Sequence, residues 1–294
     1  MTLPTSELTH MSLCAGYGGI DLGLKAALSK VKTVCYSEIE AYAIENLISK
    51  MEADLLDPAP IWTDLKTLPW EQFNGRVDIL SGGFPCQPFS AAGVRKADDD
   101  PRHLWPHIVK GIKGLGCPPI VFFENVEGIL SAKLKGTDWS DPQGTPVLLH
   151  ILRELERLGY YSTAGIFSAS EVGAPHRRKR VFILGINASL EKSSADYVQS
   201  LIESSETDRP SILWPAARGE DQFDWEPPRV VNDEDILDFP ENPQTEEEAY
   251  RKLCVSVDNR TDELRLLGNG VVPATATKAF SYLWKDIYSH VDFT

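Results

Sequence analysis

The 294-residue sequence has few cysteines: there are five, and they include no C-x-x-C pair. An odd number without such a pair disfavours a disulfide framework or a zinc knuckle, and it is typical of a protein in a reducing cytoplasm. Long hydrophobic runs are also lacking, because no apolar stretch approaches the roughly 20 residues needed to span a bilayer. The N-terminus lacks the basic and then apolar pattern of a signal peptide. We therefore expect a soluble cytoplasmic chain without a metal or a membrane partner.

An excess of basic residues is missing as well, since the formal net charge is −14 at pH 7. Nucleic-acid binding normally needs a basic surface, so this charge argues at first against such a partner. The acids are unevenly distributed, however. Residues 186–264 hold 20 Asp and Glu against 7 Lys and Arg, and the remainder is nearly neutral. Basic residues cluster at 177–180 within that remainder, so a local basic site is compatible with the composition.

What the sequence does contain is an alternation of short apolar strands and amphipathic helices. Strands are predicted at residues 8–14, 31–37, 61–63, 77–80, 120–123, 160–168 and 181–186, and helices at 20–28, 39–51, 146–158 and 275–288. This alternation predicts an α/β fold with a mostly parallel sheet. We assign residues 1–186 to this domain, with 264–294 returning to it. Residues 187–263 form a separate acidic region.

A glycine turn, Cys14-Ala15-Gly16-Tyr17-Gly18-Gly19, joins the first strand to the first helix. Such a turn lets backbone amides approach a ligand at the positive end of a helix, although a tight structural turn has the same sequence. Glu38 follows the second strand about 20 residues later, where a carboxylate can bind ribose hydroxyls. Together they favour a nucleoside cofactor. Asp64 either accepts from an adenine amino group or caps a helix.

A second motif, SGGFPCQPFS at residues 81–90, places Cys86 between two prolines after an apolar strand. Parallel sheets place ligand-binding and catalytic groups at the carboxyl ends of their strands. A lone cysteine is most often a buried apolar residue, but packing does not explain one in a loop rich in glycine and proline. The pattern therefore favours a nucleophile. Glu124 ends the neighbouring strand, so it either faces the same cleft or is a solvated loop acid.

These motifs, together with Glu124-Asn125-Val126, Arg178-x-Arg180 and Gly268-Asn269, resemble in type and order those of DNA cytosine-5 methyltransferases. The resemblance covers roughly residues 8–186 and 264–288. It implies a Rossmann-like methyltransferase domain with S-adenosylmethionine as cofactor, and a small recognition region at 187–263. It further implies an enzyme of bacterial or phage type that acts as a monomer on double-stranded DNA, in the cytoplasm of a bacterium or a phage-infected host.

The resemblance also implies a role for each matched residue. Cys86 would add to carbon 6 of a cytosine that has been flipped out of the duplex. Glu124 would keep ring nitrogen 3 protonated, Arg178 would bind the exocyclic oxygen, and Arg180 would support the site or contact phosphate. The residues implied at the cofactor are Cys14, Ala15, Gly16, Tyr17, Gly18, Gly19, Glu38, Ile39, Asp64, Leu65, Pro85, Leu104 and Asn269.

The sequence departs from the family pattern at four positions. Cys14 replaces a phenylalanine, Ser12 stands where aspartate is common, His176 replaces a glutamine, and Gly270 replaces a serine. The arginine-and-threonine motif that supports a recognition domain is not found. Two other interpretations therefore remain. One is methylation of cytosine in tRNA, and the other is a catalytically silent protein whose acidic region contacts a protein partner or mimics the charge of DNA.

Overall fold

The computed structural model describes residues 1–85, 104–134, 144–207, 214, 223 and 266–293. Cys86, the predicted nucleophile, lies outside the described residues. So do nearly all of residues 208–263, which make up most of the acidic region. No described helix is both long enough and apolar enough to cross a membrane.

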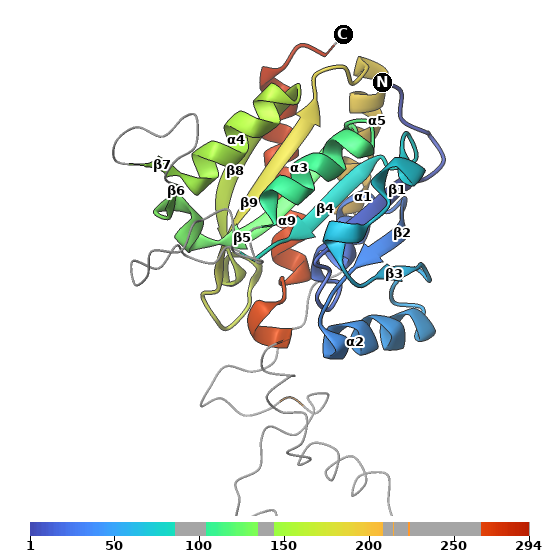
Figure 1. Cartoon of the computed structure of the whole chain (residues 1–294), viewed down its shortest axis with the longest axis vertical. Helices are drawn as coiled ribbons and strands as arrows, with labels where there is room; N and C mark the ends of the chain where they lie inside the picture. Colours follow the sequence, from blue (N-terminus) through green and yellow to red (C-terminus); the bar gives the residue numbers. More distant parts are fainter. Residues whose placement is uncertain (86–103, 135–143, 208–213, 215–222, 224–265, 294) are drawn as a thin grey trace, which may run out of the picture.

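The centre of the molecule is a seven-stranded sheet with the strand order β3-β2-β1-β4-β5-β9-β8 (Figure 1). Five neighbouring strands run parallel: β1 (Leu8–Leu13), β2 (Val31–Ser37), β3 (Ile61–Trp62), β4 (Ile79–Gly83) and β5 (Ile120–Val126). The last two are β9 (Lys179–Asn187), which is antiparallel to both its neighbours, and β8 (Tyr160–Ser168) at the edge. This arrangement confirms the predicted α/β fold with a mostly parallel sheet.

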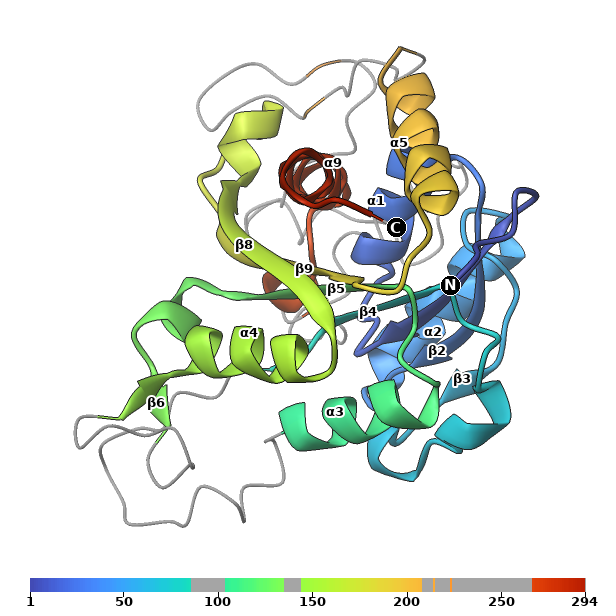
Figure 2. The same ribbon diagram turned by 90° about the horizontal axis from the view of Figure 1, so that it is seen from above.

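Helices cover both faces of the sheet, as Figure 2 shows. One face carries α1 (Gly19–Leu28), α5 (Lys192–Thr207) and α9 (Pro273–His290). The other carries α3 (Trp105–Gly114) and α4 (Val147–Arg157). Helix α2 (Ala41–Glu52) packs beside β2 and β3. The remaining elements are the short strands β6 (Lys133–Leu134) and β7 (Thr145–Pro146) and 3-10 turns at Leu65–Thr67, Trp70–Phe73, Glu127–Leu130 and Ala169–Val172.

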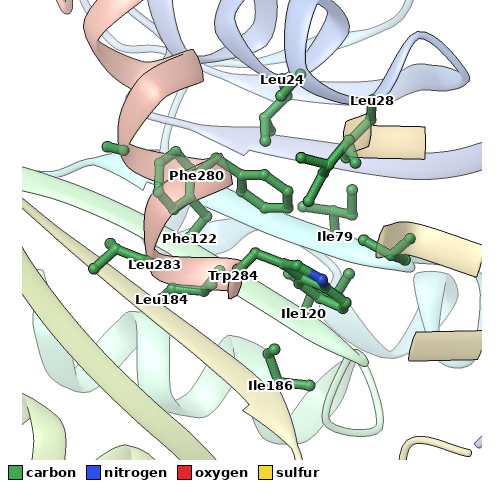
Figure 3. Close-up of a cluster of buried hydrophobic side chains, with 14 of the residues drawn as sticks. Leu24, Leu28, Ile79, Ile120, Phe122, Leu184, Ile186, Phe280, Leu283 and Trp284 are labelled. Carbon is green, nitrogen blue, oxygen red and sulfur yellow. The ribbon is translucent and has the colours of Figure 1, made fainter. Parts of the chain in front are cut away.

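Strand β5 shows why the central strands are continuous apolar runs. Its residues alternate between the two faces of a sheet that is covered on both sides. Phe122 stacks on Phe182. It also meets the ring of Phe280 from α9 edge-on, in the buried cluster that Figure 3 shows. Phe123 points the other way and contacts Phe84 and Trp105 at 5.9 and 5.6 Å between ring centroids.

Two helices that the sequence did not predict belong to these layers. Helix α3 contains Gly111 and Gly114, which weaken a helix pattern, but the structure requires small residues there. A Cβ atom on either glycine would lie 2.7 Å from the buried Trp70 side chain. Helix α5 is rich in serine and acids, yet its buried Val198 and Ile202 join the core of α1 and α9. The packed domain thus continues beyond residue 186, to the end of α5.

Candidate active site

A cavity of about 520 Å³ lies where β1, β2, β4 and β5 end. Many of the predicted site residues line it together: Cys14, Gly16, Glu38, Ile39, Asp64, Leu65, Pro85, Leu104, Glu124, Arg180 and Asn269. Ala15, Tyr17, Gly18, Gly19 and Arg178 are not among its lining residues. The carboxyl ends of parallel strands are where α/β folds place ligands, so the position of the cavity is the expected one.

The glycine turn between β1 and α1 forms one wall of this cavity. Gly16 has a φ of +56°, and a Cβ atom added to it would meet nothing within 4 Å. The turn therefore leaves free space above its backbone, which a ligand can approach closely. Gly18, with a φ of +81°, is the N-cap of α1. At Gly19, a Cβ atom would overlap the carbonyl group of Val271, so this glycine serves packing.

The Glu38 side chain connects the glycine turn to residues 39 and 40, which lie just before α2. One carboxylate oxygen accepts from the Gly16 amide at 2.7 Å, and the other accepts from the amides of Ile39 and Glu40 at 2.8 and 3.0 Å. The side chain is buried, with 7% of its surface exposed. A carboxylate has about four lone-pair sites, so one remains for a ligand hydroxyl. Glu38 can thus shape the cavity and bind a ligand at once.

Asp64 caps a helical turn, which is one of the two roles that the sequence left open. Its position also allows the other role, hydrogen bonding to an adenine amino group. Its side chain accepts from the Lys66 amide at 2.9 Å and so caps the 3-10 turn that starts at Leu65. The residue also lines the cavity. The remaining acceptor sites of the carboxylate are available to a donor on a ligand.

Glu124 and Arg180 form a buried ion pair across β5 and β9. The Arg180 Nε atom lies 2.8 Å from Glu124 Oε1, and only 5% of Glu124 is exposed. Burial raises the pKa of Glu124 to about 7, although Arg180 and then Arg178 act in the opposite direction. A carboxyl group with this pKa exchanges a proton readily near neutral pH. Glu124 is therefore not a solvated loop acid.

Asn125 fixes the chain just before Cys86. Its side-chain amide donates to the carbonyl oxygen of Phe84 at 3.0 Å, and its own carbonyl oxygen accepts from the Val126 amide at 2.9 Å. Pro85 follows and lines the cavity. The β4 end that leads to Cys86 is thus held against the β5 end that carries Glu124.

Arg178 lies apart from the lining of the cavity. Its guanidinium donates to the carbonyl oxygens of Gly268, at 2.7 Å, and of Gly270. The resemblance implied that Arg178 binds the exocyclic oxygen and that Arg180 supports the site or contacts phosphate. In the structure, Arg180 is the arginine that reaches the cavity and pairs with the buried acid.

Comparison with known proteins identifies the family of the chain. The family model described as "C-5 cytosine-specific DNA methylase" matches residues 8–284. The chain belongs to this family. M.NlaX of Neisseria lactamica, named a Type II methyltransferase, is 33% identical over 175 residues, which cover 60% of this chain and 51% of that protein. M.HgiEI of Herpetosiphon aurantiacus, named a Type II methylase, is 34% identical over 189 residues, which cover 63% of this chain and 38% of that protein.

Among solved structures, a mutant of DNMT2 from Spodoptera frugiperda matches with a TM-score of 0.49 and 19% identity, over 62% of this chain and 50% of that one. The chain spans between about two fifths and about half of the length of the two bacterial methylases above.

The cavity also has lining residues that the motifs did not indicate. Tyr42 lies in the first turn of α2, four positions after Glu38, and Leu266 precedes the Gly268-Asn269 motif. Their closeness in sequence to predicted residues was the available signal. Cys14 shares the cavity, and burial raises the pKa of its thiol to about 12, so it stays protonated.

Proposed function

We propose that this chain methylates carbon 5 of a flipped-out cytosine in double-stranded DNA, with S-adenosylmethionine as the methyl donor. The observation that carries the proposal is the buried Glu124–Arg180 pair, which opens into the same cavity as Glu38 and Asp64. One end of the cavity thus offers acceptors for a nucleoside. The other offers a proton donor on β5, next to the end of β4, the strand that precedes the predicted nucleophile in the chain.

The residues present fit S-adenosylmethionine. Gly16 leaves the close approach open, Glu38 has acceptor capacity for ribose hydroxyls, and Asp64 has it for an adenine amino group. Ile39, 70% exposed in the wall of the cavity, offers an apolar surface to the base. When bound, this cofactor supplies an electrophilic methyl group.

The residues of the chain then prepare the cytosine. Cys86, whose role rests on its sequence motif, adds as a thiolate to carbon 6, and the ring electrons shift toward carbon 5. Glu124 donates its proton to nitrogen 3 and so neutralises the charge that develops in the ring. From the geometry we assign the exocyclic oxygen to Arg180 rather than to Arg178. Carbon 5 would then take up the methyl group, with S-adenosylhomocysteine as the leaving group. Loss of the proton from carbon 5 to solvent, return of the nitrogen 3 proton to Glu124 and departure of Cys86 as a thiolate would restore the aromatic ring.

We further propose that target recognition resides in the acidic region, within residues 208–263, since α5 belongs to the packed domain. The enzyme would act as a monomer in the cytoplasm of a bacterium or a phage-infected host. Its family relatives are Type II methyltransferases of bacteria, and this is the source of the expected setting.

The test is bisulfite sequencing of DNA and of tRNA from cells that express the chain, with Cys86→Ala as the inactive variant. Cys117→Ala, which changes a half-buried cysteine on another loop, is the matched control. We expect methylated cytosines in DNA with the wild type and the control, and none with Cys86→Ala. Cofactor binding by calorimetry should survive in Cys86→Ala. Methylation confined to tRNA would move the substrate to RNA, and methylation of neither would favour the silent binding protein.

A further inference from the structure

The turn that carries Asn269 into the cavity is held from two sides. It overlaps the end of a helical turn at residues 266–269, and the Gly270 amide donates to the Leu266 carbonyl oxygen at 2.8 Å. On one side, Arg178 binds the carbonyl groups of Gly268 and Gly270. On the other side stands Tyr17, a residue of the glycine turn that does not itself line the cavity.

Tyr17 contacts this turn in two ways. Its hydroxyl group donates to the carbonyl oxygen of Val271. Its ring occupies the space beside Gly270, where any added Cβ atom would overlap the ring carbons. Burial raises the pKa of the Tyr17 hydroxyl to about 12, so it remains a donor throughout the neutral range.

Tyr17 is itself held in place by Lys50 of α2. The Lys50 ammonium donates to the Tyr17 carbonyl oxygen and to Asn46 Oδ1, each at 2.7 Å. The same ammonium lies 4.6 Å from the centroid of the Tyr17 ring, within the range of a cation–π contact. Because both the backbone and the ring of Tyr17 are fixed, Tyr17 can determine the position of the residues that it contacts.

We propose that Tyr17 is a positioning residue that, through Val271 and Gly270, holds the turn at 268–271 so that Asn269 faces the cofactor cavity. The assignment of a cofactor to this cavity rests on the proposed function. The position of the turn is independent of the proposed function, because the turn has this position in the free protein. Tyr17 thus couples the glycine turn at one end of the chain to the segment before α9 at the other.

The first test is amide hydrogen exchange across residues 266–275 of the free protein. Tyr17→Phe removes only the hydrogen bond to Val271, whereas Tyr17→Ala also removes the ring, so exchange should accelerate in both and most in the second. We expect about 10-fold or more for Tyr17→Ala, as loss of a packed contact allows local opening. Unchanged exchange in both variants overturns the proposal. Should Tyr17→Ala fail to fold, Tyr17→Phe decides by itself.

The second test is rescue. Gly270→Ser should lower the affinity for S-adenosylhomocysteine by about 10-fold or more in calorimetry, because overpacking displaces the turn. The same change in the Tyr17→Ala background should cost clearly less, since the ring is gone and only the Leu266 carbonyl oxygen, 2.9 Å from the added Cβ atom, still crowds it. Gly268→Ser is the steric control, because its Cβ atom would meet nothing within 4 Å. An equal loss from Gly270→Ser with and without the ring contradicts the proposal. A wild type that binds no S-adenosylhomocysteine overturns the proposed function instead, and the exchange experiment still decides on Tyr17.

Discussion

At the scale of single residues, Glu124 carries the clearest chemical consequence. Its pKa of about 7 results from burial that outweighs the attraction of Arg180 and Arg178. The protonated form is the one that can donate to nitrogen 3, so the activity that depends on Glu124 should fall as the pH rises through 7. Glu124→Gln removes the proton donor and should lower turnover by on the order of 100-fold or more.

This prediction is checked by rates of methyl transfer from pH 6 to 9, with Glu127→Gln as the control. Glu127 is half exposed and lies 3.9 Å from Lys179, so its loss should leave the rate and the profile unchanged. Cofactor affinity should also be unchanged in Glu124→Gln. Wild-type turnover with the same pH profile would mean that Glu124 only holds the loop.

Substitution of Arg180 tests independently whether the Glu124–Arg180 ion pair sets the pH dependence. Because its charge lowers the pKa of Glu124, Arg180→Met should raise that pKa, and the decline of activity should move to higher pH. Lys179→Met removes a neighbouring, exposed charge and should not move it. A decline at the same pH in Arg180→Met would show that another group titrates.

The sequence motifs indicated most of the residues around the cavity, but they did not predict which contacts each of them makes. Motifs identified Arg178 and Arg180 as a pair, yet only the register of β9 against β5 places Arg180 opposite Val126 and close to Glu124. The carbonyl groups that bind Arg178 lie about 90 residues away in the chain. Such distant contacts leave no trace in local spacing. Tyr17 was predicted at the cofactor for its place in the motif, whereas its contacts are with Val271 and Lys50.

At the scale of elements, local patterns predicted those strands and helices whose apolar spacing is undisturbed. Helix α3 was missed because packing against Trp70 demands glycine, the residue that argues against a helix. Helix α5 was missed because serine and acidic residues surround its apolar positions. In both cases tertiary contacts, rather than local preference, determine the element.

A polar network joins β1, β2, β4 and α1 beneath the glycine turn. Buried His10 bonds Thr33 Oγ1 at 2.9 Å and Ser81 Oγ at 2.7 Å, and its Nδ1 atom lies 3.4 Å from Asp21. Burial lowers the pKa of His10, although Asp21 and Asp57 oppose this. The folded state therefore disfavours the proton that the unfolded chain binds below about pH 6.5.

It follows that the free energy of unfolding should decrease as the pH falls below about 6.5, because the unfolded state then binds more protons. The contribution of His10 has a limiting slope of about 1.4 kcal/mol per pH unit. Urea unfolding at pH 5 and pH 7.5 measures it. His10→Gln cannot bind the proton and should have a shallower dependence, whereas His290→Gln, at the exposed end of α9, is the control. Equal slopes in wild type and His10→Gln would exclude His10 as the source.

At the scale of the whole molecule, the charge distribution limits how the proposed DNA substrate can be bound. Of the basic cluster, Arg178 is bound to backbone carbonyl groups and Arg180 to Glu124, which leaves Arg177 and Lys179 as its exposed cations. The acidic region contributes few bases of its own, such as Arg209, Arg218, Arg229 and Arg251. Few phosphates can therefore be neutralised.

Each neutralised phosphate contributes about −0.9 to the slope of log affinity against log salt concentration, so we expect a shallow slope, of magnitude below roughly 5. Arg177→Gln should reduce that magnitude by about 1, because it removes one phosphate contact. Lys285→Gln removes the same charge from α9, where Lys285 pairs with Glu206, and should leave the slope unchanged. Fluorescence anisotropy with duplex DNA over a salt series measures all three proteins. A steep slope that disappears when Arg209, Arg218, Arg229 and Arg251 are replaced would instead mean that the acidic region presents its bases on one DNA-binding face and turns its acids to solvent.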